Sequence, residues 1–91
     1  MNDRIERIRH SLAVALAPTE LEVRDDSDKH VGHAGARDGR GHFHVHIVSS
    51  AFDGLAALAR HRAVYAALGD MMTTDIHALA IDARAPQEIQ Q

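Results

Sequence analysis

The sequence has 91 residues, of which 45% are hydrophobic and 25% charged, and its formal net charge at pH 7 is −3. This balance is typical of a folded globular chain, and the length suits a single domain over residues 1–91. A negative net charge disfavours a general nucleic-acid binder, whose basic surface normally shows in the total. The sequence contains no run of 18 apolar residues and its charged first segment does not resemble a secretory signal, so we expect a cytoplasmic protein.

Cysteine is absent, whereas histidine occurs eight times. The chain therefore offers no disulfide, no thiol nucleophile and no thiolate ligand of its own. Five of the histidines lie between His30 and His46. Because imidazole is a common metal ligand, this cluster is the first candidate for a functional site.

Apolar residues recur at three- and four-residue steps over residues 3–16, with charged residues between them. This spacing predicts an amphipathic helix that is capped by Asn2 or Asp3 and ended by Pro18. Residues 20–24 then alternate polar and apolar side chains, which predicts a half-buried strand.

Residues 25–41 follow neither period and hold four glycines, so we expect a long loop, flexible over about 27–41. Residues 42–49 alternate again, with Phe43, Val45 and Ile47 predicted to face the core. The two strands on either side of the loop should form an antiparallel pair.

Residues 51–72 return to a helical period, which predicts a short helix near Leu55 and a longer one from about Arg60. A third strand is predicted over 76–83, followed by a polar tail over 86–91. The connection from the second strand is long enough for the third strand to lie parallel to it. The order α-β-β-α-α-β thus predicts an α+β fold, with helices on one face of a three-stranded mixed sheet.

The segment Phe52-Asp-Gly54-Leu-Ala-Ala-Leu-Ala-Arg60-His-Arg62 resembles the signature of the BolA-like family, which is Phe, any residue, Gly, five residues and Arg-His-Arg. Three further segments resemble the family in the same order: Asp25-Asp-Ser27, His42-Phe43 and Ile76-His-Ala-Leu79. The resemblance runs from about residue 5 to residue 88 and implies a fold similar to class II KH domains. We expect structural roles for Phe52 and for Gly54, which would allow a tight strand-to-helix turn.

The resemblance implies two functions. The first is an adaptor that binds a monothiol glutaredoxin, with glutathione, around a shared [2Fe–2S] cluster in iron–sulfur trafficking or iron regulation. The second is a DNA-binding transcriptional regulator. No catalytic motif surrounds the serines, so we do not expect an enzyme. We expect a monomer or weak homodimer when the chain is alone.

The resemblance also implies that His77 is a ligand of the shared cluster, and that a second ligand, His or Cys, lies in the loop. Here the loop ligand can only be histidine, and its spacing from the first strand favours His30, with His33 as the alternative. Two imidazoles can replace two thiolates on one iron, but the other iron still needs sulfur. We therefore expect no cluster on the chain alone. By strand parity, His77 should share a face with Leu79 and Ile81; the competing interpretation is a half-packed histidine at a strand end.

His42, His44 and His46 alternate on one face of the second strand, about 6.6 Å apart. Such a row can chelate zinc or copper, which is a third hypothesis, but we favour the interpretation of a polar, water-facing strand surface. His42 belongs to the family pattern, where we expect a structural contact. No role is assigned to the other two histidines.

Arg60, His61 and Arg62 form a candidate basic patch near a helix start, where backbone N–H groups also favour anions. The resemblance implies partner contact here, so we predict a partner or nucleic-acid surface. The competing interpretation is salt bridging to acids such as Asp53 or Asp70.

Overall fold

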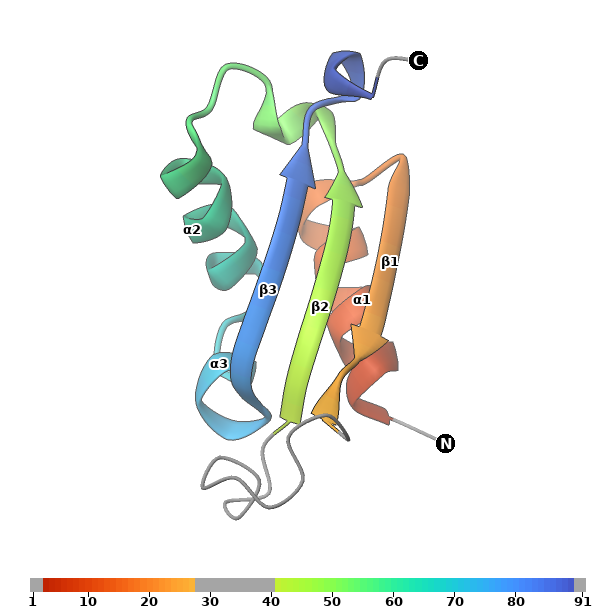
Figure 1. Cartoon of the computed structure of the whole chain (residues 1–91), viewed down its shortest axis with the longest axis vertical. Coiled ribbons are helices and arrows are strands. Elements are labelled where there is room, and N and C mark those ends of the chain that lie inside the picture. Colours follow the sequence, from red (N-terminus) through yellow and green to blue (C-terminus); the bar gives the residue numbers. More distant parts are fainter. Residues whose placement is uncertain (1–2, 28–40, 90–91) are drawn as a thin grey trace.

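The computed structural model describes residues 3–27 and 41–89. Its elements follow the predicted order (Figure 1). They are α1 (Asp3–Leu16), β1 (Glu20–Asp25), β2 (Gly41–Val48), the 3-10 turn η3 (Ser50–Phe52), α2 (Ala57–Leu68), α3 (Met71–Thr74), β3 (Ile76–Arg84) and the 3-10 turn η4 (Pro86–Glu88). The predicted α+β class is confirmed.

The three strands form one sheet in the order β1-β2-β3, so β2 is central (Figure 1). β1 runs antiparallel to β2, with Val23 opposite Val45, and β2 runs parallel to β3, with Val45 opposite Ile81. A parallel pair needs a crossover connection, which α2 and α3 provide. The predicted mixed sheet is therefore confirmed.

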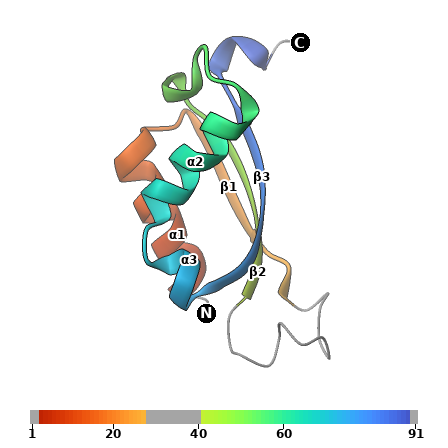
Figure 2. The same ribbon diagram turned by 90° about the vertical axis from the view of Figure 1, so that its left-hand side faces the viewer.

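The helices lie on one side of the sheet (Figure 2). The apolar residues predicted to point inward from β2 are buried, and α1 and α2 cover them. The largest contributors are Ile8, Leu12, Phe43, Val45, Ile47, Phe52, Val64, Leu68 and Ile76. Burial of this apolar surface is the main favourable term in folding. Among the described residues, no helix covers the opposite face of the sheet, which we call the open face.

The helical boundaries after β2 differ from those predicted. The short helix expected near Leu55 is wrong, because residues 53–56, between η3 and α2, are not helical. Gly54 has a φ of 75°, a left-handed conformation that breaks a helix and suits glycine. Phe52 is completely buried in the core. α2 begins at Ala57 rather than at Arg60.

The carboxylate of Asp75 fastens α1 to the turn that starts β3. Arg7 donates to both of its oxygens, Nη2 to Oδ1 at 2.8 Å and Nη1 to Oδ2 at 3.0 Å. Arg4 and Thr74 donate further hydrogen bonds at 3.3 and 3.0 Å. The Asp75 side chain is only 12% exposed, and the hydrogen bonds from Arg7 hold its pKa below the ordinary value. This long-range contact links α1 to the start of β3.

We predict that Asp75→Asn lowers the free energy of unfolding by about 1–3 kcal/mol, because the hydrogen bonds of a charged acceptor are lost. Since folding lowers the pKa of Asp75, its contribution is present above the ordinary carboxyl pKa and is lost as the pH falls through the folded value. Urea unfolding between pH 3 and pH 7 measures both effects. Asp70→Asn, one turn earlier, is the matched control. If the two variants lose equal stability at pH 7, the network contributes nothing specific.

Candidate functional site

His77 lies where the pairing of β2 with β3 becomes irregular. Gly41 is opposite Ile76 and His42 is opposite Ala78, so His77 is the extra residue of a bulge. Its exposed ring lies beside the ring of His42, with the two centroids 5.1 Å apart and the planes tilted by 52°. The predicted shared face with Leu79 and Ile81 is therefore wrong, because the bulge interrupts strand parity.

The start of β2 is anchored on both sides. The N–H of Gly41 donates to the carbonyl of Asp75 at 2.9 Å, next to β3. The N–H of His42 donates to Ser27 Oγ at 3.0 Å, and the N–H of Ser27 donates to Asp25 Oδ1 at 2.8 Å. These hydrogen bonds fix the β2 backbone that lies opposite the bulge at His77.

The second predicted cluster ligand, His30 or its alternative His33, lies outside the described residues, and its assignment stays a prediction. Within 3–27 and 41–89, no group of three or more His, Cys, Asp or Glu side chains is arranged to hold a metal ion. Of the predicted cluster ligands, the described residues include only His77, which is exposed on the bulge.

The hypothesis of a zinc or copper site on β2 is wrong for His46, because both of its ring nitrogens have protein partners. Nδ1 lies 2.9 Å from Asp82 Oδ2 on β3, and Nε2 lies 3.2 Å from Glu20 Oε1 on β1. The hydrogen bond to Asp82, with that to Glu20, raises the pKa of His46 above its ordinary value, although partial burial opposes the shift. His46 thus links all three strands on the open face.

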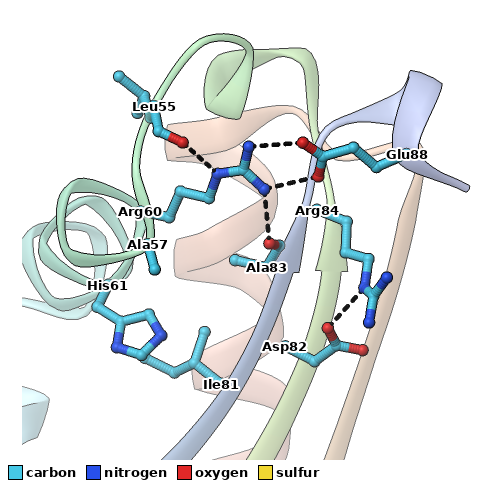
Figure 3. A pocket seen from close by; sticks show the side chains of 9 residues that line it. All are labelled: Leu55, Ala57, Arg60, His61, Ile81, Asp82, Ala83, Arg84 and Glu88. Carbon is cyan, nitrogen blue, oxygen red and sulfur yellow. Dashed lines mark hydrogen bonds and ion pairs between the residues drawn. The ribbon is translucent and has the colours of Figure 1, made fainter.

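Arg60, from the predicted basic patch, is held within the fold (Figure 3). Its Nε donates to the Leu55 carbonyl at 2.8 Å and its Nη1 donates to the Ala83 carbonyl at 3.1 Å. Two further hydrogen bonds, of 2.7 and 2.8 Å, form a bidentate pair with Glu88. This pair and the Ala85 N–H lower the pKa of Glu88 to about 2. The competing interpretation, salt bridging, is therefore confirmed for Arg60, although its partner is Glu88 and not Asp53 or Asp70.

The rest of the patch is more accessible. His61 is half-buried and lines a cleft of about 410 Å³ between the start of α2, the end of β3 and η4 (Figure 3). Arg62 is exposed on α2. Leu58 and Tyr65 are 61% and 41% exposed and lie one turn on either side of Arg62. Sequence reasoning missed these two residues, although their four- and three-residue spacing from Arg62 could have revealed a second apolar face of the helix.

The two candidate regions lie near opposite ends of β3 (Figure 1). Arg60 contacts Ala83, which is six residues along β3 from His77. At about 3.3 Å per residue, this separation is roughly 20 Å. The His77 bulge and the Arg62 surface can therefore be altered separately by mutation.

Within the described ranges, no helix is both long and apolar enough to cross a membrane.

Comparison with known proteins shows similarity over most of the chain. A family model described as BolA-like protein matches residues 12–88. BolA-like protein 1 from Homo sapiens is 47% identical over 81 residues, which cover 89% of this chain and 57% of that protein. The DNA-binding transcriptional regulator BolA from Escherichia coli (strain K12) is 42% identical over 76 residues, 84% of this chain and 70% of that protein.

The solved structure of the BolA domain of SufE1 from Arabidopsis thaliana is similar in fold, with a TM-score of 0.87 and 43% identity, and the match covers 98% of this chain and 99% of that one. The chain spans only 24% of the whole SufE-like protein 1 and 57% of the human relative. What these longer proteins do as a whole therefore carries over only as a proposal.

We predict that His46 makes the stability of the fold depend on pH near neutrality. Because folding raises its pKa, the stabilisation is complete below the ordinary histidine value of about 6.5 and is lost as the pH rises through the folded value. The expected loss is about 0.5–1 kcal/mol, since Glu20 and Asp82 are partly exposed. Urea unfolding from pH 5 to pH 9 measures it. His46→Gln should remove this dependence, whereas His44→Gln should keep it; a dependence that survives in His46→Gln contradicts the assignment.

We predict that Arg60→Lys lowers the thermal unfolding midpoint by a few degrees, because an ammonium cannot donate to two carbonyls and a bidentate carboxylate at once. Arg62→Lys, on the exposed side of α2, should leave the midpoint unchanged. Differential scanning calorimetry compares the two. An equal midpoint for both variants would show that the contacts of Arg60 do not hold the end of β3.

Proposed function

The chain belongs to the BolA-like family, and we propose that it is an adaptor that binds a monothiol glutaredoxin and shares a [2Fe–2S] cluster with it. Its role would be iron–sulfur cluster trafficking or iron regulation in the cytoplasm. We further propose that it acts by binding and not as an enzyme. The observation that carries the proposal is the exposed His77 ring on an anchored bulge, in a chain without cysteine.

The absence of cysteine makes the proposed site a divided one, because the chain has no thiolate to offer. Two imidazoles can complete the coordination of one iron, and thiolates from the glutaredoxin and glutathione would complete the other. The chain would contribute His77 and a loop histidine, His30 or His33. Because the chain would supply ligands for only one of the two irons, we propose that it holds no cluster alone.

We propose that a second surface, on α2, contacts the partner when no cluster is present. Arg62 is exposed there between Leu58 and Tyr65, a combination of a cation and apolar side chains that is common in interfaces. Arg60, held by Glu88, would act by fixing the start of the helix, and His61 would border the surface. The separation from His77 supports two modes of contact with one partner.

A DNA-binding regulator is the second candidate, and the E. coli relative named for that function favours it. The net charge of −3 weighs against tight binding, because few phosphates can be neutralised. Nanomolar, sequence-selective retention of duplex DNA at physiological salt, in an electrophoretic mobility assay, would make the regulator the better proposal.

The adaptor proposal is tested by reconstituting the purified chain with a monothiol glutaredoxin, glutathione, iron and sulfide. Visible circular dichroism should show a mixed [2Fe–2S] species with the wild type, little or none with His77→Ala, and an unchanged one with His10→Ala, an exposed histidine on α1. His30→Ala should leave a weaker species partly rescued by His33, and His30→Cys should shift the spectrum toward a thiolate-ligated site.

A His77→Ala complex indistinguishable from the wild type would rule out the ligand assignment. A stable cluster on the chain alone would rule out the divided site.

A further inference from the structure

We propose that His42 is a positioning residue for His77, holding its imidazole in the orientation needed to reach a metal carried by the partner. This inference rests on the proposed function for its purpose. The juxtaposition itself is structural: the two rings lie with centroids 5.1 Å apart, side by side at the first residues of two parallel strands.

An exposed histidine normally exchanges between several side-chain rotamers, and fixing one of them costs entropy on binding. His77 is exposed and stands on a bulge, where strand parity does not determine the direction of its side chain. The neighbouring ring of His42 restricts this choice by occupying the space on one side. A ligand that is already oriented binds more tightly, because less order has to be created in the complex.

His42 can serve as a support because it is itself held in place. Its ring is half-buried and its Nε2 atom is buried. The backbone N–H of His42 donates to Ser27 Oγ. The adjacent Gly41 is closely packed, since a Cβ atom there would lie 2.7 Å from both the Phe43 ring and Ser27 Oγ. The backbone that carries His42 is therefore held from both sides.

Because its Nε2 atom is buried, we infer that His42 acts through its ring shape and not by metal binding through that atom. A buried Nε2 cannot reach a metal presented by a second protein unless the ring turns out of its packing. The inference therefore predicts that a phenyl ring, which has the same flat shape and no donor nitrogen, can replace the imidazole. A methyl group, as in His42→Ala, is too small to replace it.

The test compares wild type, His42→Phe and His42→Ala, with His44→Ala as the matched control on the same strand face. In the chain alone, three-bond NMR couplings should report one dominant χ1 rotamer for His77 in wild type, His42→Phe and His44→Ala, and averaged couplings in His42→Ala. In the complex with glutaredoxin and glutathione, the cluster of His42→Ala should be lost to a chelator about three- to tenfold faster. His42→Phe should match the wild type. Amide spectra check that each variant is folded, and His42→Leu takes the place of His42→Ala if that variant is not.

Each alternative result decides the matter. If His77 keeps a single rotamer in His42→Ala, His42 does not position it. If His42→Phe and His42→Ala both abolish the cluster as His77→Ala does, His42 is a ligand and the inference is wrong. If the wild type forms no cluster with a glutaredoxin, the proposed function fails, but the rotamer measurement on the chain alone still decides whether His42 orients His77.

Discussion

The parallel pairing of β2 with β3 is the constraint on which the rest of the structure depends. A parallel neighbour requires the chain to return across the whole length of the sheet, and α2 and α3 make this return. Two arginine–carboxylate pairs hold the ends of the returning strand. Arg7 binds Asp75 immediately before β3, and Arg60 binds Glu88 and the carbonyl of Ala83 near its end. The chain has few aromatic residues to enlarge the core, and these long-range polar contacts help to fix the topology.

The contacts at the start of β3 also tie the candidate site to the rest of the fold. The bulge at His77 lies directly after Asp75, whose side chain binds α1 and whose carbonyl accepts the N–H of Gly41. The same residue thus fixes the helix layer and the first pair of the parallel ladder. A ligand placed there is therefore positioned by the fold itself.

The sequence predicted the elements well because their signals are periodic. Three- and four-residue steps identified α1, and alternation identified the inward residues of β2, which are all buried. It could not predict the bulge at His77, because a bulge is a property of two paired strands and leaves no mark in either one. It also could not predict that Arg60 would choose Glu88, 28 residues away, over the nearer Asp53 or Asp70. This pairing requires η4 to bring Glu88 beside Arg60 at the end of β3. Such a tertiary contact is not encoded in local sequence spacing.

The three histidines of β2 show the same limit at the level of chemistry. Along the strand they are equivalent, each two residues from the next and on one face, and this equivalence suggested a common metal site. Their neighbours on β3 differ, however. His42 and His44 are opposite alanines, whereas His46 is opposite Asp82. The carboxylates beside His46 occupy both of its nitrogens and favour its protonated form. The bulge instead brings a second imidazole to His42. One residue type at regular spacing therefore has different chemistry at each position, because the register of the neighbouring strand decides what each ring meets.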